Sequence, residues 1–147
     1  MVYEGGTEIN VRGKELAHLD GICFLPLYVQ GGGVREPHWH PNAAELIYVV
    51  NGEAEIGLVG PDDMWETFLI CAGDLAFFPM NWFHYVASIG DEPLDSIVYV
   101  SHVAPTRIDL SDSVGFLSRA VRGHRRARRQ CFRRASAADR CRPRSSG

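Results

Sequence analysis

Long hydrophobic segments are missing from this sequence of 147 residues, and none of its apolar runs is long enough to span a bilayer as a helix. The amino-terminal stretch MVYEGGTEINVRGKEL also lacks the apolar core of a secretory signal, so we expect a cytoplasmic protein without a membrane partner. No CxxC spacing is present, and free thiols are a better expectation than a disulfide framework for the four cysteines, Cys23, Cys71, Cys131 and Cys141.

Basic residues are scarce over most of the chain. Residues 1–118 contain seventeen acidic residues but only four basic ones, a balance of −13: Arg12, Lys14, Arg35 and Arg107. Residues 119–147 reverse this pattern, with eleven arginines against one acidic residue and a balance of +10. The net charge of −3 describes neither part, and the composition predicts an acidic domain followed by a basic tail.

The Arg-rich tail, residues 119–147, contains almost no core-forming residues, and we expect it to be disordered. A nucleic acid or another anionic surface is one partner that such arginines could bind. However, Phe132 is the only aromatic residue of the tail, and no recognisable binding fold accompanies it. The abrupt change of composition is also what a shifted reading frame or a passive terminus would produce, and we favour that interpretation over nucleic-acid binding.

Helical periodicity is absent from most of the acidic domain, where short apolar runs alternate with turn signals about every 8 to 12 residues. This spacing predicts an all-β sandwich or barrel. A short helix is expected within residues 106–120, capped by Ser111 or Asp112. A lead-in arm is expected at residues 1–20 and the domain itself at 21–118, with strands at 22–30, 34–40, 45–50, 53–59, 66–71, 75–79, 83–89 and 94–103.

Two local signals refine this pattern. Asn51-Gly52 lies between two apolar runs and predicts a tight hairpin, because both residues tolerate the positive φ of a type I′ turn. Pro26 cannot donate a backbone hydrogen bond, so it predicts an edge position or a bulge for the first strand of the domain.

The most informative stretch is PHWHPNAAE at residues 37–45. Side chains at i and i+2 of a strand lie on one face, about 6.6 Å apart along the chain, so His38 and His40 would point to the same place. A turn after His40 would let Glu45 begin the next strand and return its carboxylate to that place. Two imidazoles and a carboxylate can form a metal site, although hydrogen-bonded histidines at a strand end would give the same pattern.

A mononuclear site calls for a fourth ligand, and His84 is the best candidate. It lies at the start of a predicted strand in which Val86 and Ser88 share its face. Structural or solvated roles are expected for the other histidines, which lie in the arm, at the end of the last strand and in the tail: His18, His102 and His124.

Both histidine-containing stretches resemble motifs of the cupin superfamily. Residues 33–52 are similar to the first cupin motif and residues 73–84 to the second. Asn81 stands where glycine is usual and Ser88 where asparagine is usual. The resemblance covers roughly residues 22–104 and is strongest to germins and oxalate decarboxylases.

The resemblance implies a single-domain, jelly-roll-like β-barrel that binds one divalent metal ion through His38, His40, Glu45 and His84. Three neutral imidazoles and one carboxylate would leave open positions on an octahedral ion, where water, dioxygen or a substrate carboxylate can bind. No cysteine is available there, so Mn(II) or Fe(II) suits the donors, whereas affinity alone would favour Zn(II) or Cu(II). The resemblance favours Mn(II) as the cofactor, with Fe(II) or Zn(II) as alternatives.

Arg35 precedes His38 by three residues, an odd offset that would place the two on opposite faces of a regular strand unless a bulge intervenes. The resemblance to oxalate decarboxylases implies that Arg35 is a catalytic residue that binds the substrate beside the metal. A guanidinium suits a small carboxylate such as oxalate because its donors form a bidentate fork. A surface arginine paired with Glu36 or another acid is the alternative.

Decarboxylation also needs an acid that supplies a proton. The inward-facing glutamate of the similar enzymes corresponds by register to Val98, and no serine-glutamate lid follows the last strand. Asp109, close to Arg107 in the sequence, is a distant substitute for which a surface salt bridge is the better expectation.

Two functions therefore remain open. The first is a manganese-dependent enzyme acting on a small carboxylate such as oxalate, as a decarboxylase or an oxidase. The second is a non-catalytic metal-binding cupin that serves storage, binding or sensing. A homodimer or a higher homo-oligomer is expected in either case, because the resemblance is to a family whose single domains commonly pair through their sheets.

Overall fold

The computed structural model describes residues 2–3 and 5–118 of the chain. The tail for which we expect disorder, residues 119–147, lies outside this part, and so do His124, Cys131 and Cys141.

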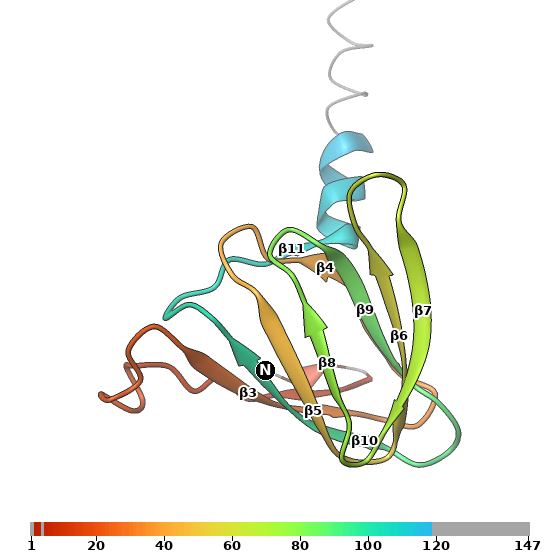
Figure 1. Ribbon diagram of the computed structural model, residues 1–147, viewed down its shortest axis with the longest axis horizontal. Helices are drawn as coiled ribbons and strands as arrows, with labels where there is room; N and C mark the ends of the chain where they lie inside the picture. The colour runs from red at the N-terminus through yellow and green to blue at the C-terminus, as the bar shows by residue number, and fades with distance from the viewer. Residues whose placement is uncertain (1, 4, 119–147) are drawn as a thin grey trace, which may run out of the picture. The chain divides into compact units, whose positions relative to one another are not determined.

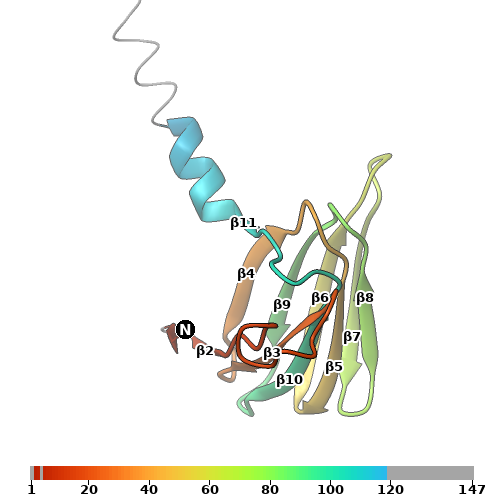
Figure 2. The same cartoon turned by 90° about the vertical axis from the view of Figure 1, so that its left-hand side faces the viewer.

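Eleven strands form two antiparallel sheets in the described part of the chain (Figures 1 and 2). The first sheet has the order β1 (Val2–Tyr3), β2 (Gly6–Glu8), β3 (Cys23–Val29), β10 (Leu94–Val100), β5 (Glu45–Asn51) and β8 (Leu75–Phe78). The second has the order β11 (Ile108–Asp109), β4 (Val34–Trp39), β9 (Phe83–Ser88), β6 (Glu53–Val59) and β7 (Trp65–Cys71). This arrangement confirms the predicted all-β, jelly-roll-like fold.

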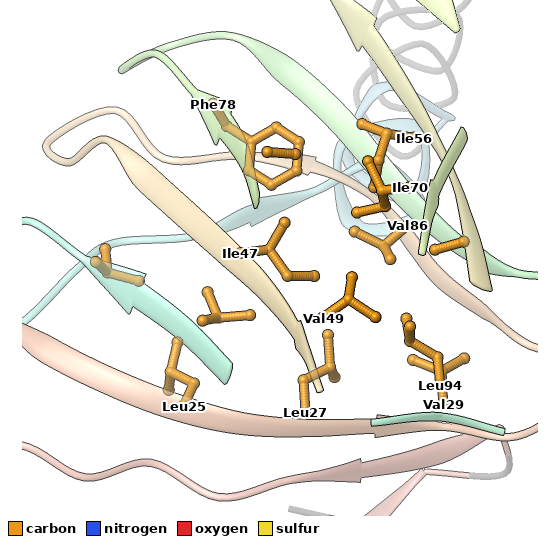
Figure 3. Close-up of a cluster of buried hydrophobic side chains, with 14 of the residues drawn as sticks. Leu25, Leu27, Val29, Ile47, Val49, Ile56, Ile70, Phe78, Val86 and Leu94 are labelled. Carbon is orange, nitrogen blue, oxygen red and sulfur yellow. The ribbon is translucent and has the colours of Figure 1, made fainter. Parts of the chain in front are cut away.

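The hydrophobic core lies between the two sheets (Figure 3). Ile47 and Val49 of β5 approach Ile56 of β6 and Val86 of β9 across the interior. Along β9 every second residue is buried, as expected for a strand with one face on the core. Full burial of each such aliphatic side chain contributes about 1.5–3 kcal/mol, which makes the sheets a rigid support for polar side chains placed between them.

The Asn51-Gly52 dipeptide forms a corner between the sheets, so the predicted hairpin is wrong. β5 pairs with β10 and β8, whereas β6 pairs with β9 and β7. Gly52 has a φ of 90°, and a Cβ there would lie 2.5 Å from the carbonyl oxygen of Pro93. Glycine is therefore required where the chain leaves one sheet for the other, and a two-residue loop alone does not reveal that change of sheet.

β3 is an interior strand, and its pairings with β2 and β10 show no register shift, so both alternatives predicted from Pro26, an edge position and a bulge, are wrong. It pairs with β2 on one side and with β10 on the other. The ladder to β2 ends at Leu27, opposite Glu8, and the carbonyl oxygen of Pro26 accepts a hydrogen bond from the N–H of Ile9 just beyond β2. The N and O of a residue point to the same side of an antiparallel ladder, so the missing donor of Pro26 costs no bond to β10.

A short helix at residues 110–118 confirms the expected helical segment. The predicted cap is wrong, because Ser111 and Asp112 lie in the first turn and Asp109 stands at the N-cap position. The chain divides into two compact units at the start of this helix, after Leu110. Among the described residues, no helix is long and apolar enough to cross a membrane.

Candidate metal centre

Four buried side chains meet at one place in the first compact unit: His38, His40, Glu45 and His84. Each offers one ligand atom, and these atoms all lie within 4.8 Å of one another. His38 lies in β4 and His40 follows that strand directly, while Glu45 begins β5 and His84 lies opposite His38 in the β4–β9 ladder. The structure thus brings together all four residues that the sequence predicts as ligands.

Backbone carbonyl groups orient the three imidazole rings. Each ring donates an Nδ1–H hydrogen bond to a carbonyl oxygen, at 2.7 Å for His38, 2.8 Å for His40 and 2.9 Å for His84. The partner of His40 is Thr106, in the segment that follows β10. A carbonyl oxygen can only accept, so Nδ1 carries the proton and Nε2 of a neutral ring offers its lone pair to the centre. An outer hydrogen bond of this kind also fixes the tautomer of histidine ligands in metalloproteins.

Glu45 lies among these Nε2 atoms. Its Oε2 atom is 2.9 Å from Nε2 of His40 and 3.7 Å from Nε2 of His84. The Nε2 atom of His84 is buried without a hydrogen-bond partner. A carboxylate oxygen and an imidazole lone pair at 2.9 Å repel each other unless a proton or a metal ion lies between them, so the cluster calls for a cation.

The buried environment favours the protonation states that bind metal ions. Burial, together with the charges of His84 and Arg35, lowers the pKa of His38 to about 3, so this ring is neutral at pH 7. Burial acts to raise the pKa of Glu45, but the favourable interactions of its carboxylate with the nearby rings of His40 and His84 outweigh burial and hold that pKa well below its ordinary value. A neutral imidazole and an ionised carboxylate are the forms in which these groups act as ligands.

Two of the separations between donor atoms can be compared with those around a single octahedral ion. Cis ligands about 2.1 Å from such an ion lie about 3 Å apart, and trans ligands lie about 4.2 Å apart. The separations of 2.9 and 3.7 Å from Glu45 fall in or near this range. Imidazole and carboxylate donors without sulfur suit Mn(II), Fe(II) or Zn(II).

Neighbouring residues hold two of the four side chains in place. The ring of Phe78 stacks on His84 at a centroid distance of 4.3 Å and an interplanar angle of 8°. The backbone N–H of Asn81 donates to the carbonyl oxygen of His40 at 3.0 Å. Asn81 has a φ of 68°, a left-handed conformation that asparagine tolerates better than most residues. This conformation explains why asparagine can replace the usual glycine of the second motif.

Arg35 points into the interior because a β-bulge separates it from His38. Arg35 lies opposite Val86 and His38 opposite His84, which sets three steps along β4 against two along β9 and confirms the predicted bulge. Val86 and His84 share the buried face of β9, so Arg35 shares the face of His38. The alternative is wrong about a surface location, because the side chain of Arg35 is 12% exposed, but its pairing with an acid is confirmed, because Nη2 lies 3.4 Å from Oε2 of Glu8.

Glu8 is a residue of this region that sequence reasoning missed. It ends β2, is only 5% exposed, and contacts both Arg35 and Arg107. The polar arm shows no strand periodicity, and Glu8 is one of seventeen acidic residues in residues 1–118. No signal in the sequence could have singled it out.

The two positions considered for a proton donor are both buried. Val98 is 4% exposed and belongs to the core, so an apolar side chain occupies this inward position. Asp109 forms the expected salt bridge to Arg107, with 3.0 Å between Oδ1 and Nε. It is not a surface residue, however, because it is buried and lies opposite His38 in the β4–β11 ladder. Opposite residues of a ladder point to the same face, so the prediction that Asp109 is distant from the centre is wrong.

One further histidine and two cysteines of the described residues can be compared with the roles expected for them. His102 accepts a hydrogen bond from the N–H of Ala104 through its Nδ1 atom, which fits the role expected for it. Cys23 and Cys71 are free thiols, as expected.

Comparison with known proteins matches residues 4–125 to the profile of the cupin family. An oxalate decarboxylase from Bacillus subtilis is 44% identical over 73 residues, which cover 50% of this chain and 19% of that protein. A germin-like protein from Oryza sativa subsp. japonica is 36% identical over 85 residues, which cover 58% of this chain and 35% of that protein. The chain spans less than two thirds of the length of these relatives.

Solved structures of similar fold include the oxalate decarboxylase of Lactobacillus farciminis in complex with formate. It has a TM-score of 0.76 and 30% identity, and the match covers 79% of this chain and 34% of that one. The oxalate decarboxylase of B. subtilis, studied for its Mn(II) centres, has a TM-score of 0.71 and 31% identity over 74% of this chain and 29% of that one. These similarities agree with the resemblance carried by the two histidine motifs. The chain belongs to the cupin family.

Proposed function

We propose that this protein is a manganese-dependent cupin that acts on or binds a small carboxylate such as oxalate. The observation that carries the proposal is the buried set of His38, His40, Glu45 and His84, whose ligand atoms lie within 4.8 Å of one another. The similar enzyme of B. subtilis has Mn(II) centres, and that of L. farciminis binds formate, which supports both the metal and the class of ligand.

In this proposal the four side chains hold one divalent ion, which supplies a Lewis acid with open positions for a carboxylate. Mn(II) is our choice, and Fe(II) or Zn(II) suits the same donors. The protein contributes orientation, because backbone carbonyl groups hold the Nε2 atoms of the histidines toward the centre. It also keeps bulk water away from the ligands, since Glu45 is 6% exposed and His84 is 1% exposed.

Arg35 is the residue that we propose as catalytic, through binding of the substrate. It shares the interior face of His38, and its charge contributes to the low pKa of that histidine. Its guanidinium can therefore act on a carboxylate at the metal centre through its planar fork of donors. Lysine lacks that fork, so Arg35→Lys should weaken oxalate binding about tenfold while the metal content stays unchanged.

A non-catalytic cupin that binds metal for storage, binding or sensing is the second candidate. Val98 favours it, because this buried apolar side chain cannot transfer a proton. Asp109 lies opposite His38 in the β4–β11 ladder, but its carboxylate is paired with Arg107.

Metal analysis followed by an oxalate assay separates the two candidates. Formate without peroxide would support a decarboxylase, and peroxide would support an oxidase. Bound manganese without turnover would support the non-catalytic candidate. A protein that retains no divalent metal after reconstitution with manganese would contradict both.

We also propose a homodimer or a higher homo-oligomer that forms through the outer face of the first sheet. Two cross-strand rows of side chains on this face contain no charged residue. Residues 1–118 carry a charge balance of −13, which makes two copies of the protein repel each other where charged surfaces meet. Phe77 and Leu75, at one end of the rows, are 57% and 59% exposed. The rows are Phe24, Tyr99, Leu46 and Phe77, and Pro26, Ile97, Tyr48 and Leu75.

Light scattering tests this surface. Phe77→Lys should shift the protein to the monomer, because it places a charge inside the apolar rows. Leu69→Lys is a matched control on the edge strand β7, where Leu69 is 66% exposed. A wild-type monomer, or equal dissociation by both variants, would contradict the proposal.

A further inference from the structure

A second charged cluster lies beside the metal centre, where Glu8, Arg35 and Arg107 meet. Nη2 of Arg35 and Nη1 of Arg107 each lie 3.4 Å from the same atom, Oε2 of Glu8. The other carboxylate oxygen of Glu8, Oε1, accepts a hydrogen bond from the side-chain amide of Asn10 at 3.1 Å. Glu8 belongs to the first sheet and Arg35 to the second, so the cluster spans the seam between the sheets.

A cavity of about 210 Å³ lies against both arginines. Its walls include residues 5–7 and 27–29 of the first sheet and residues 34–36 of the second, with Arg107 and Asp109 beside them. A water molecule takes up about 30 Å³ in the liquid, so the cavity has room for a small organic acid.

Two of the contacts between Glu8 and the arginines are long. A charge-assisted hydrogen bond between a guanidinium and a carboxylate is about 2.7–2.9 Å long, and the strongest pairs are bidentate. Here Oε2 of Glu8 lies 3.4 Å from a nitrogen of each arginine, which is longer than that range. A carboxylate that approached Arg35 and Arg107 with both of its oxygens could form shorter bonds than Glu8 does.

We propose that Arg35 and Arg107 form one binding site for the carboxylate group of a small organic acid, and that Glu8 is an internal carboxylate which this group displaces. The proposal deepens the proposed function and rests on it for the class of ligand. Arg107 is thereby a second substrate-binding arginine, and the arm that provides Glu8 is part of the site. Asn10 remains as a hydrogen-bond partner for Glu8 when the arginines turn to the ligand.

The charge balance of the cluster determines whether replacing Glu8 should strengthen or weaken the binding of a carboxylate. Arg35 and Arg107 are faced by Glu8 and Asp109, and Glu36 also lines the cavity, which leaves a net charge of −1. This negative balance opposes the binding of a further carboxylate from a ligand. Replacing Glu8 by glutamine keeps the shape and the hydrogen-bonding oxygen but brings the balance to zero, so an incoming carboxylate should bind more tightly.

Calorimetric titration of the full chain with oxalate, in the manganese-loaded and the metal-free state, tests the proposal. Glu8→Gln should bind oxalate about tenfold more tightly than the wild type, because a charge a few ångström from the ligand is removed. Arg107→Gln should bind it at least about tenfold more weakly, because one of two cationic partners is lost. Glu55→Gln is the matched control, since the partly buried Glu55 accepts a hydrogen bond from Tyr85 at 2.6 Å away from this cluster, and it should bind oxalate as the wild type does.

Circular dichroism should show that each variant is folded, and Glu8→Asp is the substitute if Glu8→Gln is not. Aspartate is one methylene shorter, so it retreats from the arginines and should also tighten oxalate binding.

Unchanged or weaker binding by the folded Glu8 variant would overturn the displacement of Glu8. Unchanged binding by Arg107→Gln, with binding still weakened in Arg35→Lys, would overturn the two-arginine site and leave the proposed function standing. The expected shifts in a protein without oxalate turnover would support the site and contradict only the catalytic function.

Discussion

Replacing Glu45 with glutamine should remove most of the stability that manganese gives to the protein. Glutamine is nearly isosteric with glutamate, so the change opens no cavity around a side chain that is 6% exposed. In the metal-free variant the new amide can donate to Nε2 of His40, which lies 2.9 Å from Oε2 in the wild type. In the metal-free wild type, Oε2 of Glu45 and Nε2 of His40 must share a proton to lie this close, and the amide hydrogen of glutamine takes its place. The metal-free variant should therefore be about as stable as the metal-free wild type.

The metal-bound variant loses a ligand and a negative charge at once. Loss of a hydrogen-bond partner outside the ligand shell already lowers metal affinity about 10- to 100-fold, so loss of Glu45 itself should cost at least about 100-fold, or about 2.7 kcal/mol. A ligand at 100 times its Kd stabilises the folded state by about 2.7 kcal/mol, which raises the Tm of a domain of this size by about 10–20 °C. At the same manganese concentration the Tm of Glu45→Gln should rise by no more than about 3 °C.

Thermal unfolding followed by circular dichroism, with manganese and with EDTA, measures this difference. Glu55→Gln controls for the loss of a carboxylate elsewhere, because Glu55 pairs with Tyr85 outside the centre, and it should keep the full manganese effect. An equal rise in Tm for the wild type and Glu45→Gln would refute the assignment of Glu45 as a ligand. A similar loss in Glu55→Gln would show that the effect is not specific to the centre.

Three further predictions concern the backbone and the pH dependence. Gly52→Ala should lower the free energy of unfolding by about 2 kcal/mol more than Gly73→Ala. The φ angles at the two sites are similar, 90° and 96°, but only at Gly52 does a backbone oxygen lie 2.5 Å from the new Cβ. Equal losses of unfolding free energy in urea would contradict the close approach at the corner. Asn81→Gly should keep or slightly raise the stability, and Asn81→Ala should lower it by about 1 kcal/mol in the same assay, since φ is 68°. The metal-free protein should lose stability as the pH falls from 6.5 toward 3, because His38 has a pKa of about 3 when folded against an ordinary 6.5, so the unfolded chain binds more protons in that window. His38→Gln should flatten this dependence in unfolding titrations at several pH values.

The strands and the shared face of His38 and His40 could be predicted because they depend on local spacing, whereas the full set with Glu45 and His84 followed from the resemblance to the two cupin motifs. The alternation of apolar residues marks a strand wherever one face is buried, and the HxH spacing puts His38 and His40 on one face of any extended segment. The bulge before His38 could be anticipated as well, since Arg35 can share its face in no other way. These features require no knowledge of which strands are neighbours.

The remaining features of the site depend on pairings between distant segments. Glu8 reaches Arg35 because β2 adds to the edge of the first sheet, and Asp109 lies opposite His38 because β11 adds to the edge of the second. Both strands are only two or three residues long, too short to show a hydrophobic period. The corner at Gly52 cannot be predicted for the same reason, because a two-residue connection has the same sequence whether its strands pair or lie in different sheets.

The distribution of basic residues argues that the amino-terminal arm belongs to the site. Of the four basic residues in residues 1–118, Arg35 and Arg107 contact Glu8, and Arg12 donates to the side chain of Asn10, which in turn donates to Glu8. Burying such a network costs several kcal/mol per ion, and apolar side chains of similar volume would hold the seam equally well or better. Stability therefore does not explain why an acidic domain gathers three of its four cations around one buried carboxylate. The placement of a guanidinium beside the metal ligands does explain it, since the buried Arg35 on the face of His38 needs a counter-ion, and the arm provides one through Glu8.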